Sequence, residues 1–419
     1  MPPPPSTTQP PTRTWTLADT WWYGLTARMP AETFEALARQ RAGEGFDAVQ
    51  LVAGIPPEVG PAHPSAASEA GAAWTPDGSI NPAYLDLARI RLETLQEAGL
   101  RPVVYGGWGH QIDWMGTEFF IEWWSRLVEA FDDLDPVYCL TGELDLWIGE
   151  AGKVWPDLDT GDLARSQLLT RRLPSIDLML TFARQVHGVW KRLSGQGKLD
   201  ERIRQWSAVL ARLRTMTERP LIVHTTTRRL GRETVLHPEY LAAETAQTGH
   251  MESARRRLWT LPQNTAPVPF INLEPWYEGI RSHFHAEDQL FALWASRLAG
   301  ASGHAYGAHG LWNAGDGQFL AHWGPQTLDE AIALDTPELL GASSRVIGEW
   351  GSDPSEGRTP PRVETAGGRL TALHRGRLTF VPDASVVSPR FERVWLPMTA
   401  EWADTWPIAG LAIAVTTMP

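Results

Sequence analysis

The feature that most restricts the fold of this chain is a regular alternation of short apolar runs with longer stretches in which apolar residues recur at helical spacing. The apolar runs predict eight strands, at 14–17, 46–52, 102–105, 137–140, 220–224, 241–245, 268–274 and 303–307. Helical patterns lie between them, at 31–41, 82–98, 117–131, 176–193, 203–216 and around Leu290, Trp294 and Leu298. Such alternation is typical of the α/β class and predicts a (β/α)8 TIM barrel with a small C-terminal β domain.

The same pattern divides the chain into three parts. Residues 1–13 are rich in proline and predict a disordered tail, and residues 14–350 form the predicted catalytic barrel with a helical insertion near 150–200. Residues 351–419 contain short alternating runs separated by Gly and Pro, which predict a small β-rich C-terminal domain. The start lacks the basic and apolar segments of a secretory signal, so as written the protein is expected to be cytoplasmic. A secreted form whose signal has been removed would look the same.

Charge and cysteine content exclude several classes of partner. The formal net charge is −12, which repels phosphate backbones and anionic headgroups, so we expect no nucleic acid and no membrane partner. The single cysteine, Cys139, rules out an internal disulfide framework and a cysteine-based zinc cluster. A neutral ligand suits this composition. The 21 tryptophans fit a large core and a sugar-stacking surface alike, and they leave a homo-oligomer open.

Polar and aromatic side chains follow the predicted strands. In a parallel barrel the active site lies at the carboxyl ends of the strands, which makes these residues the candidates. They are Asp19, Trp21, Gln50, Trp108, His110, Glu143, His224, Gln247, His250, Glu274, Trp276, Tyr277, Glu278 and Trp312. Glu143 and Glu274 end the fourth and seventh strands on opposing sides of one rim. Cleavage of a glycosidic bond needs such a pair, one acid to protonate the leaving oxygen and one carboxylate to attack the anomeric carbon or to activate water.

Other chemistries are less well supported by the residues. Glu278 lies four residues after Glu274, and by composition either could be the nucleophile, but Pro275 keeps Glu274 at the strand tip. We assign Glu278 to substrate hydroxyls, and a cap on the next helix is the equal alternative. The histidines suggest a metal, yet no His-x-His follows the first strand, so no metal site is predicted. No Gly-rich phosphate loop or Schiff-base lysine is present where a barrel would need one, so no cofactor is predicted.

From Asp19 through Trp312 the chain resembles the apiosidase-like glycoside hydrolases, family 140 and its relatives. The resemblance lies in residues 19–21, 45–50, 106–109, 247–250 and, most specifically, 274–279, Glu-Pro-Trp-Tyr-Glu-Gly. It implies a barrel followed by a small β domain, and an exo-acting enzyme that removes a terminal sugar, with furanoses among the candidates, from a plant or microbial glycan. The family's acid after strand four is often an aspartate in a Gly-Gly-Asp turn, whereas here it is Glu143 after Gly142. The absent signal suggests hydrolysis of small imported glycosides.

The working hypothesis is retaining hydrolysis, with Glu143 as acid/base and Glu274 as nucleophile. Burial should raise the pKa of Glu143, while donors such as Tyr277 keep Glu274 ionised. Trp108, Trp276 and Trp312 would form the sugar platform. Gln50, His110, His224, Gln247 and His250 would bind hydroxyls. Two alternatives stay open, a carbohydrate-binding barrel without turnover and a metal-dependent hydrolase.

Overall fold

The protein is described by a computed structural model that covers residues 15–146, 196–264, 268–351 and 361–416. Two of the expectations fall outside these residues. They are the tail at 1–13 and most of the insertion near 150–200, including the helical pattern at 176–193. The division into domains at residues 350 and 351 also stays a prediction.

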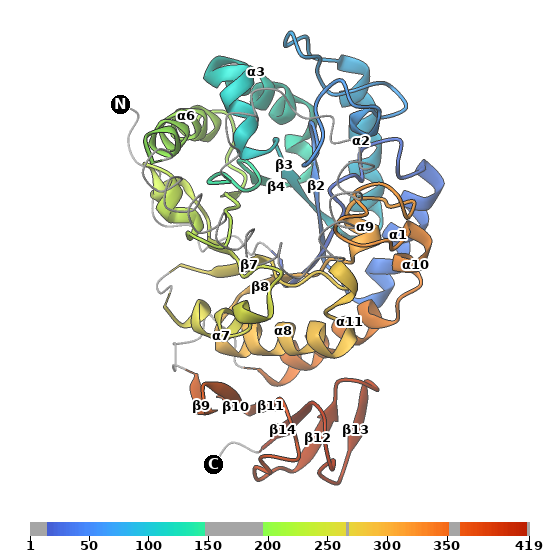
Figure 1. The fold of residues 1–419 in the computed structure, drawn as a ribbon, viewed down its shortest axis with the longest axis vertical. Helices are drawn as coiled ribbons and strands as arrows, with labels where there is room; N and C mark the ends of the chain where they lie inside the picture. The colour runs from blue at the N-terminus through green and yellow to red at the C-terminus, as the bar shows by residue number, and fades with distance from the viewer. Residues whose placement is uncertain (1–14, 147–195, 265–267, 352–360, 417–419) are drawn as a thin grey trace, which may run out of the picture.

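The described chain contains an eight-stranded parallel sheet that curls into a barrel (Figure 1). In sheet order its strands are β5 (Leu221–Ile222), β4 (Val137–Cys139), β3 (Arg101–Tyr105), β2 (Ala48–Val52), β1 (Leu17–Thr20), β8 (Gly303–Ala305), β7 (Phe270–Glu274) and β6 (Glu244–Gln247). The two ends of the sheet meet where the N–H of Ala242 donates to the carbonyl of Leu221 at 2.8 Å. The barrel predicted from the sequence is therefore confirmed.

Helices lie around the barrel (Figure 1). They are α1 (Ala31–Glu44), α2 (Pro82–Glu97), α3 (Ile112–Phe131), α6 (Gln196–Arg214), α7 (Arg257–Thr260), α8 (Ala286–Ala299), α9 (His309–Trp312), α10 (Leu328–Ile332) and α11 (Thr336–Trp350). Helix α8, which also packs against the C-terminal sheet, is buried at every residue from Gln289 to Ala299. In α2, the Asn81 side chain accepts from the N–H of Ala83 and Pro82 occupies the first turn, which is why the helix begins there. Among the described helices, none combines the length and apolarity that a membrane crossing demands.

Strand β1 lies three residues later than the sequence predicts, and this shift changes which side chains face the site. The carboxylate of Asp47 accepts the N–H groups of Thr16 and Leu17, so the chain enters the sheet only at Leu17. Successive side chains of a strand point to opposite faces. Thr20 faces the barrel interior, where its hydroxyl accepts from Gln50 Nε2 at 2.6 Å, and Asp19 faces outward toward Arg41 of α1.

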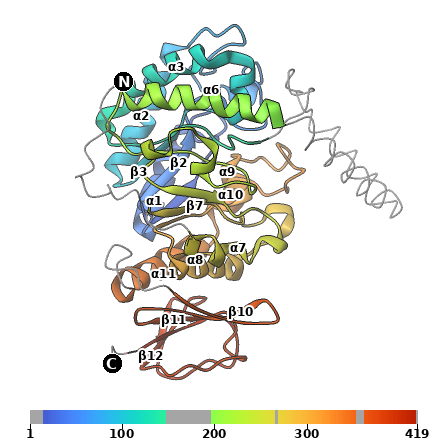
Figure 2. The ribbon, with the colours of Figure 1, turned by 90° about the vertical axis from the view of Figure 1, so that its left-hand side faces the viewer.

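The C-terminal part forms a separate six-stranded antiparallel sheet (Figures 1 and 2). Its strands, in sheet order, are β13 (Glu401–Ala403), β12 (Arg393–Leu396), β14 (Ala412–Val415), β11 (Leu378–Val381), β10 (Arg369–Arg375) and β9 (Arg362–Ala366). Phe380 of β11 packs on Phe291 and Trp294 of α8, with ring centroids 5.6 and 6.5 Å apart. The expected small β domain is thus present and packs against the outer helices rather than at the strand ends.

Candidate active site

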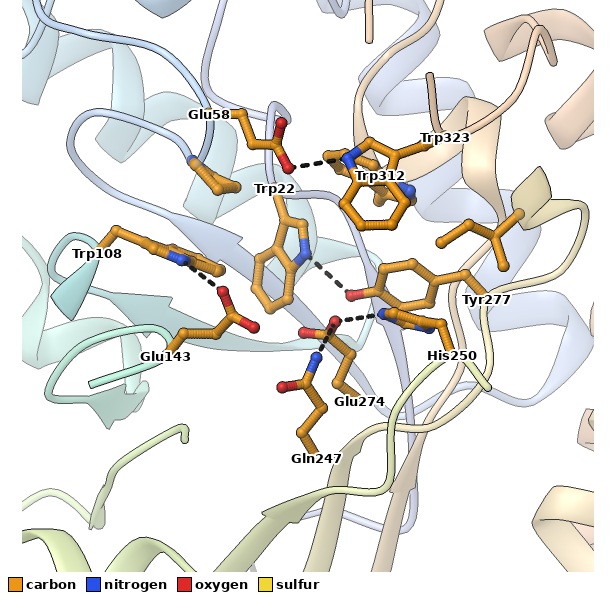
Figure 3. A pocket seen from close by; sticks show the side chains of 12 residues that line it. Trp22, Glu58, Trp108, Glu143, Gln247, His250, Glu274, Tyr277, Trp312 and Trp323 are labelled. Carbon is orange, nitrogen blue, oxygen red and sulfur yellow. Dashed lines mark hydrogen bonds and ion pairs between the residues drawn. The ribbon is translucent and has the colours of Figure 1, made fainter. Parts of the chain in front are cut away.

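A pocket opens at the carboxyl ends of the barrel strands, where the following loops converge (Figure 3). Its empty volume, open mouth included, is about 460 Å³. Among the described residues it is lined by Trp22, Pro57, Glu58, Trp108, Glu143, Gln247, His250, Glu274, Tyr277, Ile280, Trp312 and Trp323. Seven of the fourteen residues proposed from the sequence are in this set, and both candidate carboxyls are among them.

Glu274 is directed into the pocket by an irregularity in its strand. The pairing of β6 with β7 moves from Ala246 opposite Asn272 to Gln247 opposite Glu274, so Leu273 is an extra residue in β7. Such a bulge re-aims the side chain that follows it. The Glu274 carboxylate is then held through Oε1, which accepts from Gln247 Nε2 at 2.6 Å and lies 2.7 Å from His250 Nε2 (Figure 3). Oε2 is the less constrained oxygen.

Glu143 is placed by a tight turn after β4. A Cβ at position 142 would come within 2.4 Å of the Trp108 ring, so only glycine allows the ring to lie there. Glu143 itself has a φ of 41°, a left-handed conformation that costs a residue with a side chain about 1–3 kcal/mol and that is concentrated at functional sites. The Trp108 indole Nε1 donates to Oε2 of Glu143 at 3.1 Å.

The surroundings shift the pKa values of the Glu143 and Glu274 carboxyl groups in opposite directions. Burial raises the pKa of Glu143 to about 8, and the negative charge of Glu274 adds to the effect. Burial also disfavours the charged form of Glu274, but hydrogen bonding and charge from His250, with contributions from His224 and Gln247, outweigh it and lower the pKa. At neutral pH Glu143 is therefore a protonated acid and Glu274 a carboxylate.

His224 contacts the backbone of Glu143 and the carboxylate of Glu274. It is fully buried, and burial lowers its pKa, so the ring is neutral near pH 7. Its Nδ1 accepts from the backbone N–H of Glu143 at 3.4 Å, which places the ring proton on Nε2. Nε2 lies 3.4 Å from Oε2 of Glu274. His224 thus lies behind the pocket and supports both acids, although it does not line the cavity.

Several aromatic groups complete the walls. Tyr277 receives the indole N–H of Trp22 at its hydroxyl oxygen, 3.0 Å away, and its ring lies 4.6 Å from that of His250. Burial and the charge of Glu274 raise the pKa of Tyr277 well above its ordinary value, so its hydroxyl keeps its proton. Trp312 lies 6.1 Å from the Tyr277 ring. Trp22, Tyr277 and Trp312 therefore line the pocket with aromatic side chains.

Six residues proposed from the sequence lie away from the cavity, and two of them are Asp19 in β1 and Trp21 directly after that strand. Asp19 is buried against Arg41, with 2.6 Å between Oδ2 and Nε. Trp21 packs edge-on against Phe34 of α1. Because side chains alternate along this segment, Trp22 rather than Trp21 reaches the pocket.

The other four are also occupied elsewhere. Gln50 lies inside the barrel, where its Nε2 donates to the carbonyl of Leu273. His110 is buried against Trp114, and Trp276 stacks on Phe284 with 4.8 Å between ring centroids. Glu278 accepts hydroxyl hydrogen bonds from Tyr306 and Thr336, and it too is buried. The roles proposed for these residues as direct ligands of a substrate are not compatible with these positions.

Five residues of the lining were not anticipated. Trp22 could have been found from the alternation along β1. Pro57, Glu58 and Trp323 lie in loops, and Ile280 begins a single 3-10 turn, Ile280–Ser282. Spacing along the sequence does not indicate which side chains in such segments turn inward. In the described residues, no three His, Cys, Asp or Glu side chains are grouped as a metal site would require.

Comparison with known families now decides the class of the chain. The sequence model of the apiosidase-like catalytic domain matches residues 8–333. The chain belongs to this family. Membership makes the apiosidase-like chain a glycosidase, with a carbohydrate as the class of its substrate. The narrower assignment to family 140 stays a prediction.

Solved structures agree with the fold of this apiosidase-like chain. A glycoside hydrolase family 5 protein from Bacteroides vulgatus ATCC 8482 has a TM-score of 0.65 at 13% identity, with 96% of this chain and 88% of that chain covered. A second structure, named as a glycoside hydrolase, has a TM-score of 0.61 at 12% identity, over 96% and 89%. A GH5_18 structure from Streptomyces cattleya, solved in complex with GlcNAc, has a TM-score of 0.50 at 12% identity, over 83% and 82%. Comparison with curated proteins finds no match.

Proposed function

We propose that the chain is an exo-acting, retaining glycoside hydrolase in which Glu143 is the acid/base and Glu274 the nucleophile. The observation that carries this proposal is that two carboxyl groups line one pocket and have pKa values shifted in opposite directions. The pKa of Glu143 is raised to about 8 and that of Glu274 is lowered. A glycosidase separates its acid from its base in this way.

In the first step, the Glu143 carboxyl donates its proton to the glycosidic oxygen. Oε2 of Glu274 attacks the anomeric carbon, the bond from that carbon to the leaving oxygen breaks, and the aglycone departs as an alcohol. In the second step, the Glu143 carboxylate removes a proton from water, whose oxygen attacks the anomeric carbon. The bond to Glu274 breaks, and both carboxyls return to their starting states.

Anchoring of Glu274 through one oxygen supports the nucleophilic role. Gln247 and His250 both bind Oε1, which fixes the plane of the carboxylate and leaves Oε2 to attack. A nucleophile held in one orientation loses little entropy on reaching the transition state. His224, whose Nε2 lies 3.4 Å from Oε2, would stabilise the same carboxylate when it is released in the second step.

The walls of the pocket support a terminal sugar as the substrate. Trp108, Tyr277 and Trp312 offer aromatic surfaces, and the lining belongs to a pocket of limited volume, which favours a chain end over the middle of a polymer. A furanose is the ring form that the family resemblance suggests. We propose Trp108 and Trp312 as platform residues and Gln247, His250 and Tyr277 as residues that orient both Glu274 and the sugar.

The test is hydrolysis of p-nitrophenyl pentofuranosides, pentopyranosides and hexosides by the native protein, Glu143→Gln and Glu274→Gln. Glu122→Gln is the matched control, because that glutamate pairs with Arg126 on the outer surface of α3. We expect turnover of at least one glycoside, a loss of at least about a thousandfold in each pocket variant, and no change in the control. Binding without turnover would instead indicate a carbohydrate-binding barrel, and loss of native activity to a chelator would indicate a metal-dependent hydrolase.

A further inference from the structure

A third carboxylate lines the pocket at a point that the proposed chemistry does not use. Glu58 lies in the loop after β2, opposite Glu274 and beside Trp312 and Trp323 in the view of Figure 3. Its side chain is 28% exposed. This places Glu58 at the mouth of the cavity, between solvent and the buried acids.

The Glu58 carboxylate is held in place by the loop that follows α9. Trp323 donates its indole Nε1–H to Oε1 at 2.8 Å, and Nε2 of His322 lies 3.3 Å from Oε2. Trp323 is fixed in turn from the loop after β7, because the Arg281 guanidinium carbon lies 4.7 Å from the centroid of its ring. Segments from three strand ends thus meet at this carboxylate, and its oxygens have a defined orientation.

Glu58 also has a left-handed backbone conformation, with a φ of 69°. Glycine or asparagine would occupy that conformation with less strain. The loop has a glutamate at this position, and each of its carboxylate oxygens has a further lone pair that can accept a hydroxyl. Its charge reaches the catalytic acid as well, since Glu58 contributes to the raised pKa of Glu143.

The charges around the pocket restrict what it can accept. Its lining in the described part of the chain has three carboxyl groups, Glu58, Glu143 and Glu274, and includes no lysine or arginine. Arg281 lies on the Trp323 ring outside that lining. A sugar carboxylate would therefore meet the like charge of Glu58 at the mouth, with no lysine or arginine of the described lining to bind it, whereas neutral hydroxyls would meet good acceptors.

We propose that Glu58, oriented by Trp323 and His322, is a specificity-determining residue that accepts hydroxyl hydrogen bonds from a neutral sugar and excludes uronic acids. The proposal rests on the proposed function for its substrate class. It concerns recognition, so it can be measured by binding as well as by turnover.

The first experiment measures binding by saturation-transfer NMR. Methyl glycosides of glucose, galactose, xylose and arabinose are compared with the methyl glycosides of glucuronic and galacturonic acid, using the native protein, Glu58→Gln and the control Glu122→Gln. We expect the native protein and the control to bind at least one neutral sugar and to reject its uronic acid. Glu58→Gln should lower the affinity for the neutral sugar about ten- to hundredfold. It should also reduce the ratio of the affinity for the neutral sugar to that for its uronic acid by about tenfold.

The second experiment repeats the comparison by turnover, with p-nitrophenyl glycosides of the same sugars. The loss in Glu58→Gln should be in KM, because Glu58 does not touch the scissile bond. Trp323→Phe, which keeps the ring and removes the donor to Glu58, should show a smaller loss of the same kind. If Glu58→Gln fails to fold, Trp323→Phe takes its place as the variant that tests the role of Glu58.

The outcomes separate this inference from the proposed function. Selective binding of a neutral sugar without hydrolysis would end the hydrolase proposal and leave the role of Glu58 standing. Equal binding of a neutral sugar and its uronic acid, unchanged affinity in Glu58→Gln, or no binding of any probe would overturn the role of Glu58, whether or not the protein hydrolyses glycosides.

Discussion

The Trp108 indole Nε1 donates to Oε2 of Glu143 at 3.1 Å, while the ring itself lies against Gly142, the preceding residue. This single hydrogen bond favours the ionised form of the carboxyl and so lowers its pKa, against the larger effect of burial. The proposed acid is therefore tuned by a neighbour that also orients it.

Removing that donor should shift the pH dependence of the proposed reaction. In Trp108→Phe the pKa of Glu143 rises further, so the basic limb of kcat/KM moves to higher pH, and loss of orientation lowers kcat about tenfold. Trp21→Phe is the control, because Trp21 packs on Phe34 and does not reach Glu143. The measurement is a pH–rate profile from pH 4 to pH 10. A basic limb that stays in place, or moves equally in both variants, would contradict the acid role of Glu143.

The hydrogen-bond donors to Glu274 should set the position of the acidic limb in the pH profile of kcat/KM. His250→Phe keeps an aromatic ring beside Tyr277 but removes the nitrogen that lies 2.7 Å from Oε1. The pKa of Glu274 should then rise, so kcat/KM falls about ten- to a hundredfold and its acidic limb moves to higher pH. His237→Phe, on the surface beside Tyr240, is the control. An unchanged acidic limb in His250→Phe would mean that another group sets it.

The raised pKa of Glu143 also predicts a gain in stability on substitution. In the folded state this group holds its proton up to about pH 8, whereas its ordinary value is 4.5. The folded state then binds more protons than the unfolded state across that interval, so the group lowers stability progressively as pH rises from about 4.5 to about 8. Glu143→Gln removes the effect and can still accept from Trp108. Urea unfolding should show the variant more stable by ~1–3 kcal/mol at pH 7.5 and equal to the native protein at pH 4. Equal destabilisation at both values would count against the assigned pKa.

The buried pair of Asp19 and Arg41 should matter for stability and not for binding. Both side chains are fully buried, with 2.6 Å between Oδ2 and Nε. Asp19→Asn leaves the buried guanidinium with Glu44, whose Oε2 lies 2.7 Å from Nη1, as its remaining counter-charge, and should lower the free energy of unfolding by about 1–3 kcal/mol. KM and kcat should be unchanged at a temperature where the variant is folded. A tenfold rise in KM with unaltered unfolding would return Asp19 to the binding site.

The barrel could be predicted from the sequence because most of its strands lie in or beside short apolar runs, although β6, Glu-Thr-Ala-Gln, begins three residues after the start of the predicted strand at 241–245. Pairing in a parallel barrel then follows chain order, so the strand ends gather at one rim without further information. The two acids, Glu143 and Glu274, were therefore placed in one pocket by strand counting alone.

The rest of the site depended on features that spacing does not reveal. The Asp47 carboxylate accepts the N–H of Leu17, so β1 begins at Leu17, three residues later than the apolar run at 14–17 predicts. After Glu274 the strand ends and its alternation no longer applies: Tyr277 lines the pocket, whereas Trp276 and Glu278 do not. Glu58 and Trp323 come from loops far apart in the sequence, and only the folded chain brings them together at 2.8 Å.

The most direct test of the central claim is rescue by azide of a glycosidase variant. Glu143→Ala and Glu274→Ala are each incubated with an activated glycoside that the native protein hydrolyses, and the configuration of any glycosyl azide is read by NMR. We expect Glu143→Ala to form the azide with retained configuration, because azide replaces water in the second step after Glu274 has attacked. Glu274→Ala should form it with inverted configuration, because azide then replaces the nucleophile. Inverted azide from Glu143→Ala, or full hydrolysis by either variant without azide, would contradict the assignment of these two residues.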